Sequence, residues 1–233
     1  MLPLKDDQPR FSTPYVNGFL IGLNILIFLF QATLDPRSSD AFARQFGEVP
    51  AHLAAFLGGS HGYSLPDIIV PFFTSMFLHA SWPHVLGNMW FLFIFGDNIE
   101  DYLGHFKYLV FYLLCGLCAM AAQVAINPHS NVPTVGASGA IAGVLGAYFV
   151  SYPRARVLTW FPPIFLFYLP AWIILGYWFV FQFLEGTASL AIMGTRPDVG
   201  GVAFWAHIGG FVAGAVMIKI FPERQRRTPY AYR

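Results

Sequence analysis

The chain has very little charge. Only 11% of its 233 residues are Asp, Glu, Lys or Arg, against about 25% in soluble domains. The formal net charge of +1 provides no basic surface, so we expect no nucleic-acid partner. No HExxH motif and no glycine-rich phosphate loop is present, and the sequence predicts neither a metal nor another cofactor.

Cysteine is also scarce, which limits redox and metal chemistry. Cys115 and Cys118 are the two cysteines, three positions apart in one apolar run. That spacing places both on one face of a helix. We interpret them as small core residues rather than a disulfide or part of a metal site.

Apolar residues dominate the chain instead. They make up 56% of it, including 25 phenylalanines and 6 tryptophans. The pattern predicts an all-α, polytopic membrane protein, with one domain over 1–233 and a bundle of six transmembrane helices in a lipid bilayer. The six apolar runs cover about 15–32, 84–102, 108–126, 135–152, 164–184 and 199–221.

A long loop over about 33–72 separates the first two runs. Pro50 favours the first turn of a short helix, and Gly58-Gly59 is typical of its end. The sequence therefore predicts a short helix from Pro50 to Leu57. Its apolar residues suggest that it lies in the outer membrane interface.

The distribution of lysine and arginine predicts the orientation. With the N-terminus inside, the inner segments hold ten of the 13 basic residues. The outer loops hold the other three, which are Arg37, Arg44 and Arg196. We therefore expect both termini to face the cytoplasm. No small-residue cleavage site follows the first run, so we expect it to be retained as a span.

Four polar residues lie early in three of the apolar runs. His84 and Asn88 open the second run, Ser138 lies in the fourth, and His207 lies in the sixth. All three runs enter from the same face of the membrane. At 1.5 Å per residue, Asn88, Ser138 and His207 fall about 8–10 Å below that face. The pattern predicts one recessed site.

Small residues in the fourth and sixth runs predict that these two helices pack closely. Close approach of two helix backbones in a membrane requires such residues. The glycines that we expect around the site are Gly136, Gly139, Gly143, Gly210 and Gly214. This packing would bring Ser138 against His207.

The residue types at this site are those of nucleophilic catalysis. Ser138 can attack a peptide carbonyl, and His207 can take its proton. No Asp or Glu lies at a suitable depth, so we expect a dyad. His84 and Asn88, four apart on one helical face, are candidates for an oxyanion hole. His79 either lines the site or faces water.

At these residues the chain resembles the rhomboid intramembrane serine proteases. The resemblance covers about 71–221 and includes HxxxN at His84, GxSG at Ser138 and AHxxG at His207. It implies a six-helix core, a Ser138–His207 dyad, oxyanion stabilisation by His84 and Asn88, and cleavage of transmembrane protein substrates. The six-span form resembles the bacterial type, which suggests a bacterial cytoplasmic membrane.

The chain departs from some rhomboids at Ala142. In those members, an aromatic residue at this position stacks on the histidine. Another side chain must therefore pack against His207 in this protein.

The sequence is also compatible with three other functions. A polytopic metalloprotease can share HxxxN, but its paired-glutamate motif is not present. A non-catalytic, rhomboid-like protein would bind membrane clients without cleaving them, although such proteins usually lack the serine or the histidine. A transporter could use His207 in its pathway.

Overall fold

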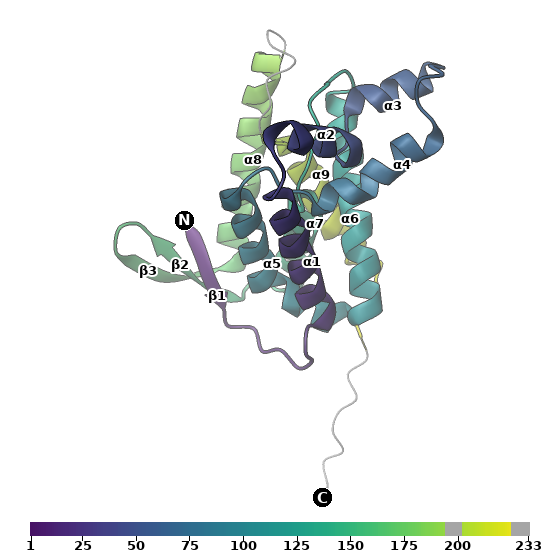
Figure 1. Cartoon of the computed structure of the whole chain (residues 1–233). Coiled ribbons are helices and arrows are strands. Elements are labelled where there is room, and N and C mark those ends of the chain that lie inside the picture. Colours follow the sequence, from purple (N-terminus) through teal and green to yellow (C-terminus); the bar gives the residue numbers. More distant parts are fainter. Residues whose placement is uncertain (194–201, 225–233) are drawn as a thin grey trace, which may run out of the picture.

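The computed structural model of this protein describes residues 1–193 and 202–224. That part of the chain folds as a helical bundle with a small sheet at its side (Figure 1). In chain order, its elements are β1 (Leu2–Asp6), α1 (Tyr15–Gln31), α2 (Pro36–Phe46), α3 (Pro50–Leu57), α4 (Leu65–Thr74), the 3-10 helix η1 (Ser75–Phe77), α5 (Trp82–Leu103), α6 (His105–Ile126), α7 (Ser138–Ser151), β2 (Arg156–Phe161), β3 (Phe165–Pro170), α8 (Ala171–Met193) and α9 (Phe204–Met217).

Helix α7 lies at the centre of the bundle. All of its residues from 139 to 148 are buried, and it packs against α5, α6, α8 and α9. A helix that is apolar on every side is stable only when other helices or lipid surround it. The position of α7 therefore follows from its composition, which lacks a polar face.

Five of the six predicted apolar runs correspond to a single helix each. The ends of α1, α5 and α6 lie within a few residues of the predicted ends. Helix α7 begins three residues later than predicted, at Ser138, and α9 begins at Phe204. Residues 199–201 of the sixth run lie outside the described residues.

The fifth run, predicted as one helix over 164–184, is wrong in its first part. Residues Phe165–Pro170 form strand β3, and α8 begins only at Ala171. Strand β3 pairs antiparallel with β2, and β2 pairs with β1 in a three-stranded sheet, so the all-α prediction is also corrected. The aromatic residues Phe165, Phe167 and Tyr168 of this segment favour strands, and the segment is apolar enough to resemble a membrane span.

The predicted six spans are confirmed in part. Within the described residues, two helices are both long and apolar enough to cross a membrane, His105–Ile126 and Ala171–Leu190. Four further apolar helices are shorter, namely Tyr15–Gln31, Leu65–Phe77, Ser138–Ser151 and Phe204–Met217. Helices α7 and α9 have 14 residues each and so rise only about 21 Å.

The long first loop contains three helices instead of the single predicted one. Helix α3 spans Pro50–Leu57, so the predicted helix is confirmed at both ends. Helix α2 was missed although Asp35 caps it, accepting hydrogen bonds from the N–H groups of Arg37 and Ser38. Ser64 and Asp67 form a capping box at the start of α4. Figure 1 shows α2, α3 and α4 together at one end of the bundle.

The acidic residues near the end of α5 bind the N-terminal segment. The Glu100 carboxylate accepts hydrogen bonds from the backbone N–H groups of Val16 (3.0 Å) and Asn17 (2.6 Å), in the first turn of α1. Asp101 accepts one from the Ser12 hydroxyl at 2.5 Å. A carboxylate at a helix N-terminus satisfies free N–H groups and the helix dipole.

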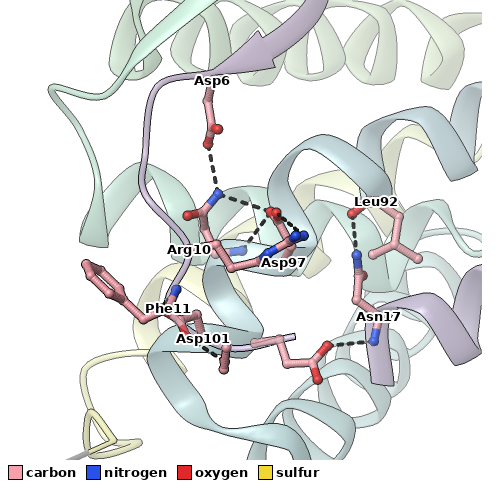
Figure 2. A network of polar contacts seen from close by, with 10 residues as sticks. Asp6, Arg10, Phe11, Asn17, Leu92, Asp97 and Asp101 are labelled. Carbon is pink, nitrogen blue, oxygen red and sulfur yellow. Dashed lines mark hydrogen bonds and ion pairs between the residues drawn. The ribbon is translucent and has the colours of Figure 1, made fainter. Parts of the chain in front are cut away.

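Figure 2 shows this polar network between α5 and the N-terminal segment. The Asn98 amide donates to the Asp6 carboxylate at 3.0 Å, and Arg10 lies 3.5 Å from Asp97. The Asn17 amide donates to the Leu92 carbonyl at 3.0 Å. These contacts let α5 continue as a helix through polar residues that would otherwise end an apolar span.

Candidate active site

Ser138 and His207 meet between α7 and α9. The Ser138 Oγ and the His207 Nε2 lie 2.7 Å apart, which is hydrogen-bonding distance. Ser138 is the first residue of α7, and His207 is the fourth residue of α9. The contact between Ser138 and His207 was expected from the sequence, but Ser138 was expected farther inside its helix.

Glycines allow the backbones of α7 and α9 to touch. A Cβ atom on Gly210 would lie 2.0 Å from the carbonyl oxygen of Gly139, and one on Gly214 would lie 1.9 Å from that of Gly143. Both distances are far shorter than a van der Waals contact. Helices α7 and α9 therefore pack closely, as predicted, and this packing brings the side chains of Ser138 and His207 into contact.

Two side chains of α8 contact the His207 ring. The Nδ1 atom of His207 lies 2.7 Å from Oε1 of Gln182. The indole of Trp178 packs beside the imidazole, with ring centroids 5.8 Å apart. Trp178 thus takes the place of the aromatic residue that is missing at Ala142. Neither residue was expected from the sequence, although a glutamine four positions after a tryptophan in an apolar run was a usable signal.

His84 lies beside Ser138 across Gly136. A Cβ atom on Gly136 would come within 2.7 Å of His84 Nε2 and 3.6 Å of Ser138 Oγ. Gly136 also has φ +133°, a conformation that disfavours any other residue. Only glycine can therefore occupy this position between the imidazole and the hydroxyl.

Asn88 and His79 bond to each other. The Asn88 Nδ2 atom lies 2.9 Å from His79 Nε2, and both side chains are buried. His79 is only 2% exposed, so the interpretation in which it faces water is wrong. Its ring also lies next to that of His84, with centroids 5.0 Å apart. His79, His84 and Asn88 thus form one polar cluster beside Gly136.

The start of α7 has free backbone donors. Ala137 occupies the N-cap and has no side chain that could accept from the first N–H groups of the helix. Such uncapped N–H groups, together with the helix dipole, favour a negative charge. Ser138 therefore lies where an oxyanion would be stabilised.

A small cavity of about 20 Å3 adjoins Ser138. Its walls include Met76, Met120, Gly136 and Ser138. This volume is enough for about one water molecule or a group of similar size. The cavity is enclosed mainly by small and apolar residues.

Glu48 ties the first loop to the segment that leads into Ser138. Its backbone N–H donates to the Thr134 carbonyl at 3.1 Å, and the Thr134 N–H donates to the Glu48 carbonyl at 2.7 Å. The Glu48 carboxyl is 2% exposed, and its Oε1 has no hydrogen-bond partner within the described part of the chain. Burial raises the pKa of this carboxyl to about 7.

Glu48 should make the stability of the protein fall as pH rises. Because its folded-state pKa is above the ordinary value of 4.5, the folded state binds the proton more tightly than the unfolded state. The favourable contribution is complete below pH 4.5 and is lost as pH rises to about 7. This shift in the Glu48 pKa corresponds to a loss of about 3 kcal/mol in the free energy of unfolding at high pH.

Thermal unfolding in detergent at pH 5 and pH 8 tests this prediction. We expect Glu48→Gln, which is neutral and of the same size, to be less sensitive to pH than the wild type and more stable at pH 8. Glu223→Gln makes the same chemical change at an exposed position outside the apolar helices and serves as the matched control. An equal loss of stability with pH in Glu48→Gln and the wild type would contradict the prediction.

Comparison with known proteins identifies the family. A model of the Rhomboid domain matches residues 67–224, a region that contains all four residues of the candidate site. The chain belongs to the rhomboid family and is a membrane protein of that family.

Several curated proteins are similar to this chain over about two thirds of its length. Rhomboid-like protein 11, chloroplastic, of Arabidopsis thaliana is 31% identical over 154 residues, which are 63% of this chain and 50% of that protein. The human presenilin-associated rhomboid-like protein, mitochondrial, is 34% identical over 153 residues, 62% of this chain and 36% of that protein. Rhomboid protein 1, mitochondrial, of Saccharomyces cerevisiae is 28% identical over 170 residues, 68% of this chain and 45% of that protein. The chain thus matches half or less of the length of these relatives.

These relatives contradict the predicted location. By their names they are chloroplastic or mitochondrial proteins, and a putative rhomboid protein of Acanthamoeba polyphaga mimivirus is also similar, with 27% identity over 157 residues. They point to an organellar or eukaryotic membrane. The prediction of a bacterial cytoplasmic membrane with both termini in the cytoplasm is therefore wrong, because a compact set of spans does not distinguish these membranes.

Proposed function

We propose that this protein is an intramembrane serine endopeptidase that cleaves transmembrane proteins with a Ser138–His207 dyad. The observation that carries the proposal is the 2.7 Å contact between the Ser138 hydroxyl and the His207 imidazole. Rhomboid proteins are generally intramembrane serine proteases, although some are non-catalytic. This chain has both the serine and the histidine, in contact, which favours the catalytic alternative.

The chemistry begins with attack on the substrate peptide bond. His207 accepts the proton of the Ser138 hydroxyl as the oxygen bonds to the carbonyl carbon, and the imidazolium then protonates the leaving amine. An acyl-enzyme remains on Ser138. Water, with its proton taken by His207, hydrolyses this ester and regenerates the hydroxyl.

The negative charge that develops on the carbonyl oxygen needs hydrogen-bond donors. The Ser138 backbone N–H at the uncapped start of α7 is one. His84 lies beside Gly136 and can reach the same region, and Asn88 belongs to the same cluster. We assign His84 and Asn88 to oxyanion stabilisation, with donors that are oriented before the reaction begins.

The membrane arrangement is part of this proposal. We assign six helices to the bilayer, namely α1, α5, α6, α7, α8 and α9. The short helices α7 and α9 begin at or near the site residues, so water can reach the serine through the loop that precedes α7. Non-helical backbone is tolerated at membrane depth where it lines such a wet cavity.

A cleavage assay with a single-span reporter protein tests the proposal. Purified wild type in liposomes should cleave the reporter, whereas Ser138→Ala should not, and a chelator should have no effect. Cleavage that survives in Ser138→Ala but stops with chelator would favour a metalloprotease. A wild type that cleaves no reporter in a panel, and that does not react with a fluorophosphonate at Ser138, would support a non-catalytic role.

The cavity beside Ser138 predicts a preference for small residues at the cleavage site. A volume of about 20 Å3 accepts a methyl group but not a phenyl ring. We expect a reporter with alanine before the scissile bond to be cleaved about 10-fold or more faster than one with phenylalanine. Met120→Ala enlarges the cavity and should reduce that ratio. Equal rates for both reporters in the wild type would exclude this cavity as the specificity pocket.

A further inference from the structure

We propose that helix α8 positions the catalytic imidazole, through Gln182 and Trp178. Gln182 holds the proton of His207 on Nδ1, and Trp178 fixes the plane of the ring. This inference rests on the proposed function, since it assigns to α8 the role that a carboxylate plays in a Ser-His-Asp triad.

The hydrogen bond to Gln182 selects the tautomer of His207. The Gln182 Oε1 atom can only accept, so the Nδ1 atom that lies 2.7 Å away carries the proton. A neutral imidazole has one N–H group, which leaves Nε2 with a free lone pair. Nε2 is the atom that faces the Ser138 hydroxyl. The ring is therefore in the tautomer that a general base requires.

The opposite tautomer would be inactive. With the proton on Nε2, the ring would donate to the Ser138 oxygen and could not take its proton. A neutral histidine without a partner at Nδ1 exchanges between the two tautomers. Gln182 removes this freedom, and it does so before substrate binds.

Trp178 supports the same ring from the same face of α8. It precedes Gln182 by four residues, so both side chains project from one side of the helix. The Trp178 and His207 rings are inclined by 35° with centroids 5.8 Å apart. Trp178 also packs against Phe211 of α9, at 6.1 Å between centroids. Trp178 thus sets the plane of the His207 ring, and Gln182 sets the position of its proton.

The burial of Gln182 itself calls for a function. The neighbouring side chains Phe181, Phe183 and Leu184 are exposed and apolar, as expected for a helix in lipid. Gln182 is buried on the opposite face, where an amide is costly unless it is hydrogen-bonded. A polar residue inside a membrane protein most often marks a functional contact.

A neutral amide is well suited to this position. His207 is buried, with 8% of its surface exposed. A carboxylate at the position of Gln182 would bring an ionised group into a medium of low dielectric constant, at a large desolvation cost. The glutamine oxygen orients the ring without that charge.

Substitutions at Gln182 separate positioning from packing. We expect Gln182→Leu, which keeps the volume but removes the acceptor, to lower kcat by about 10- to 100-fold with KM changed less than about twofold. Labelling of Ser138 by a fluorophosphonate should slow by a similar factor, because that reaction also needs an activated serine. Gln182→Asn retains a neutral acceptor oxygen on a shorter side chain and should lose less kcat than Gln182→Leu.

Leu175→Ala is the matched packing control. Leu175 is buried on α8 two turns before Gln182, so its loss loosens the helix without removing a contact to the ring nitrogen. We expect it to lower the unfolding temperature while kcat stays within about twofold of the wild type. Thermal unfolding of every variant shows whether a loss of kcat reflects a loss of folded protein.

The outcomes distinguish this inference from the proposed function. A wild type that cleaves and labels, beside a Gln182→Leu variant with kcat within twofold of it, would overturn the role of Gln182 and leave the dyad standing. The same conclusion would follow if Leu175→Ala lowered kcat as much as Gln182→Leu at equal stability. A wild type that neither cleaves nor labels would instead overturn the proposed function.

Discussion

Ser138→Ala is expected to lower the rate of reporter cleavage by about 10^3-fold or more. The same loss is expected for His207→Ala, because each residue is effective only with the other. The double variant should therefore be no slower than either single variant. Initial cleavage rates in liposomes, with equal amounts of folded protein, measure all three.

A matched control comes from the other end of the same helix. Ser151 is the last residue of α7, so Ser151→Ala makes the same chemical change far from His207 and should preserve the rate. Additive losses in the Ser138→Ala/His207→Ala variant would show that the two side chains act in separate steps. That result would contradict the dyad even if both single variants were impaired.

Gly214→Ala is expected to destabilise the protein by about 3 kcal/mol and to abolish cleavage, although Gly214 lies two helical turns from His207. The added Cβ would stand 1.9 Å from the Gly143 carbonyl oxygen and 2.6 Å from its Cα. These are backbone atoms, which cannot rotate away. Helices α7 and α9 must separate, and the 2.7 Å contact between Ser138 and His207 must lengthen.

Gly22→Ala is the corresponding control. Gly22 lies within α1, and a Cβ atom there would meet nothing within 4 Å. Alanine also has the higher helix propensity, by about 1 kcal/mol. We therefore expect Gly22→Ala to keep full activity and to unfold at the same or a slightly higher temperature. A Gly214→Ala variant that behaved in the same way would show that α7 and α9 need no such close approach.

The central contact of the site could be predicted because its signals are local in sequence. The serine and histidine motifs stand in apolar runs, and the glycines that allow close packing follow at helical spacing in the same runs. Gly143 and Gly214 therefore indicate the pairing of α7 with α9 from the sequence alone. The ends of α1, α5 and α6 were predictable for the same reason, since uniform apolar runs have clear limits.

The hairpin of β2 and β3 could not be distinguished from a helix by hydropathy. Segment Phe165–Pro170 is as apolar as α8, which follows it without a break. The strand forms because β2 provides its backbone partners, and β2 pairs in turn with β1, which lies more than 150 residues earlier in the chain. Hydropathy measures transfer into an apolar medium and carries no information about such pairing.

The partners of the site residues depended on tertiary contacts. Gln182 is 25 residues from His207 in sequence. It lies in an aromatic apolar run, which by itself indicates packing and not a hydrogen bond to the histidine. His79 could have faced water, but its bond to Asn88 buries it. In the sequence, Glu48 resembles an ordinary loop residue. In the structure, backbone hydrogen bonds join it to Thr134 and its side chain is buried.

By itself, the sequence determined that this is a helical membrane protein of the rhomboid type, with Ser138 and His207 on two closely packed helices. Those conclusions follow from composition, periodicity and short motifs, which act within single elements. The tertiary structure alone decided the tautomer-setting contact from Gln182, the sheet beside the bundle and the enclosure of Glu48. Each of these arises where elements distant in the chain meet, because hydrogen bonding and burial depend on the positions of atoms in space.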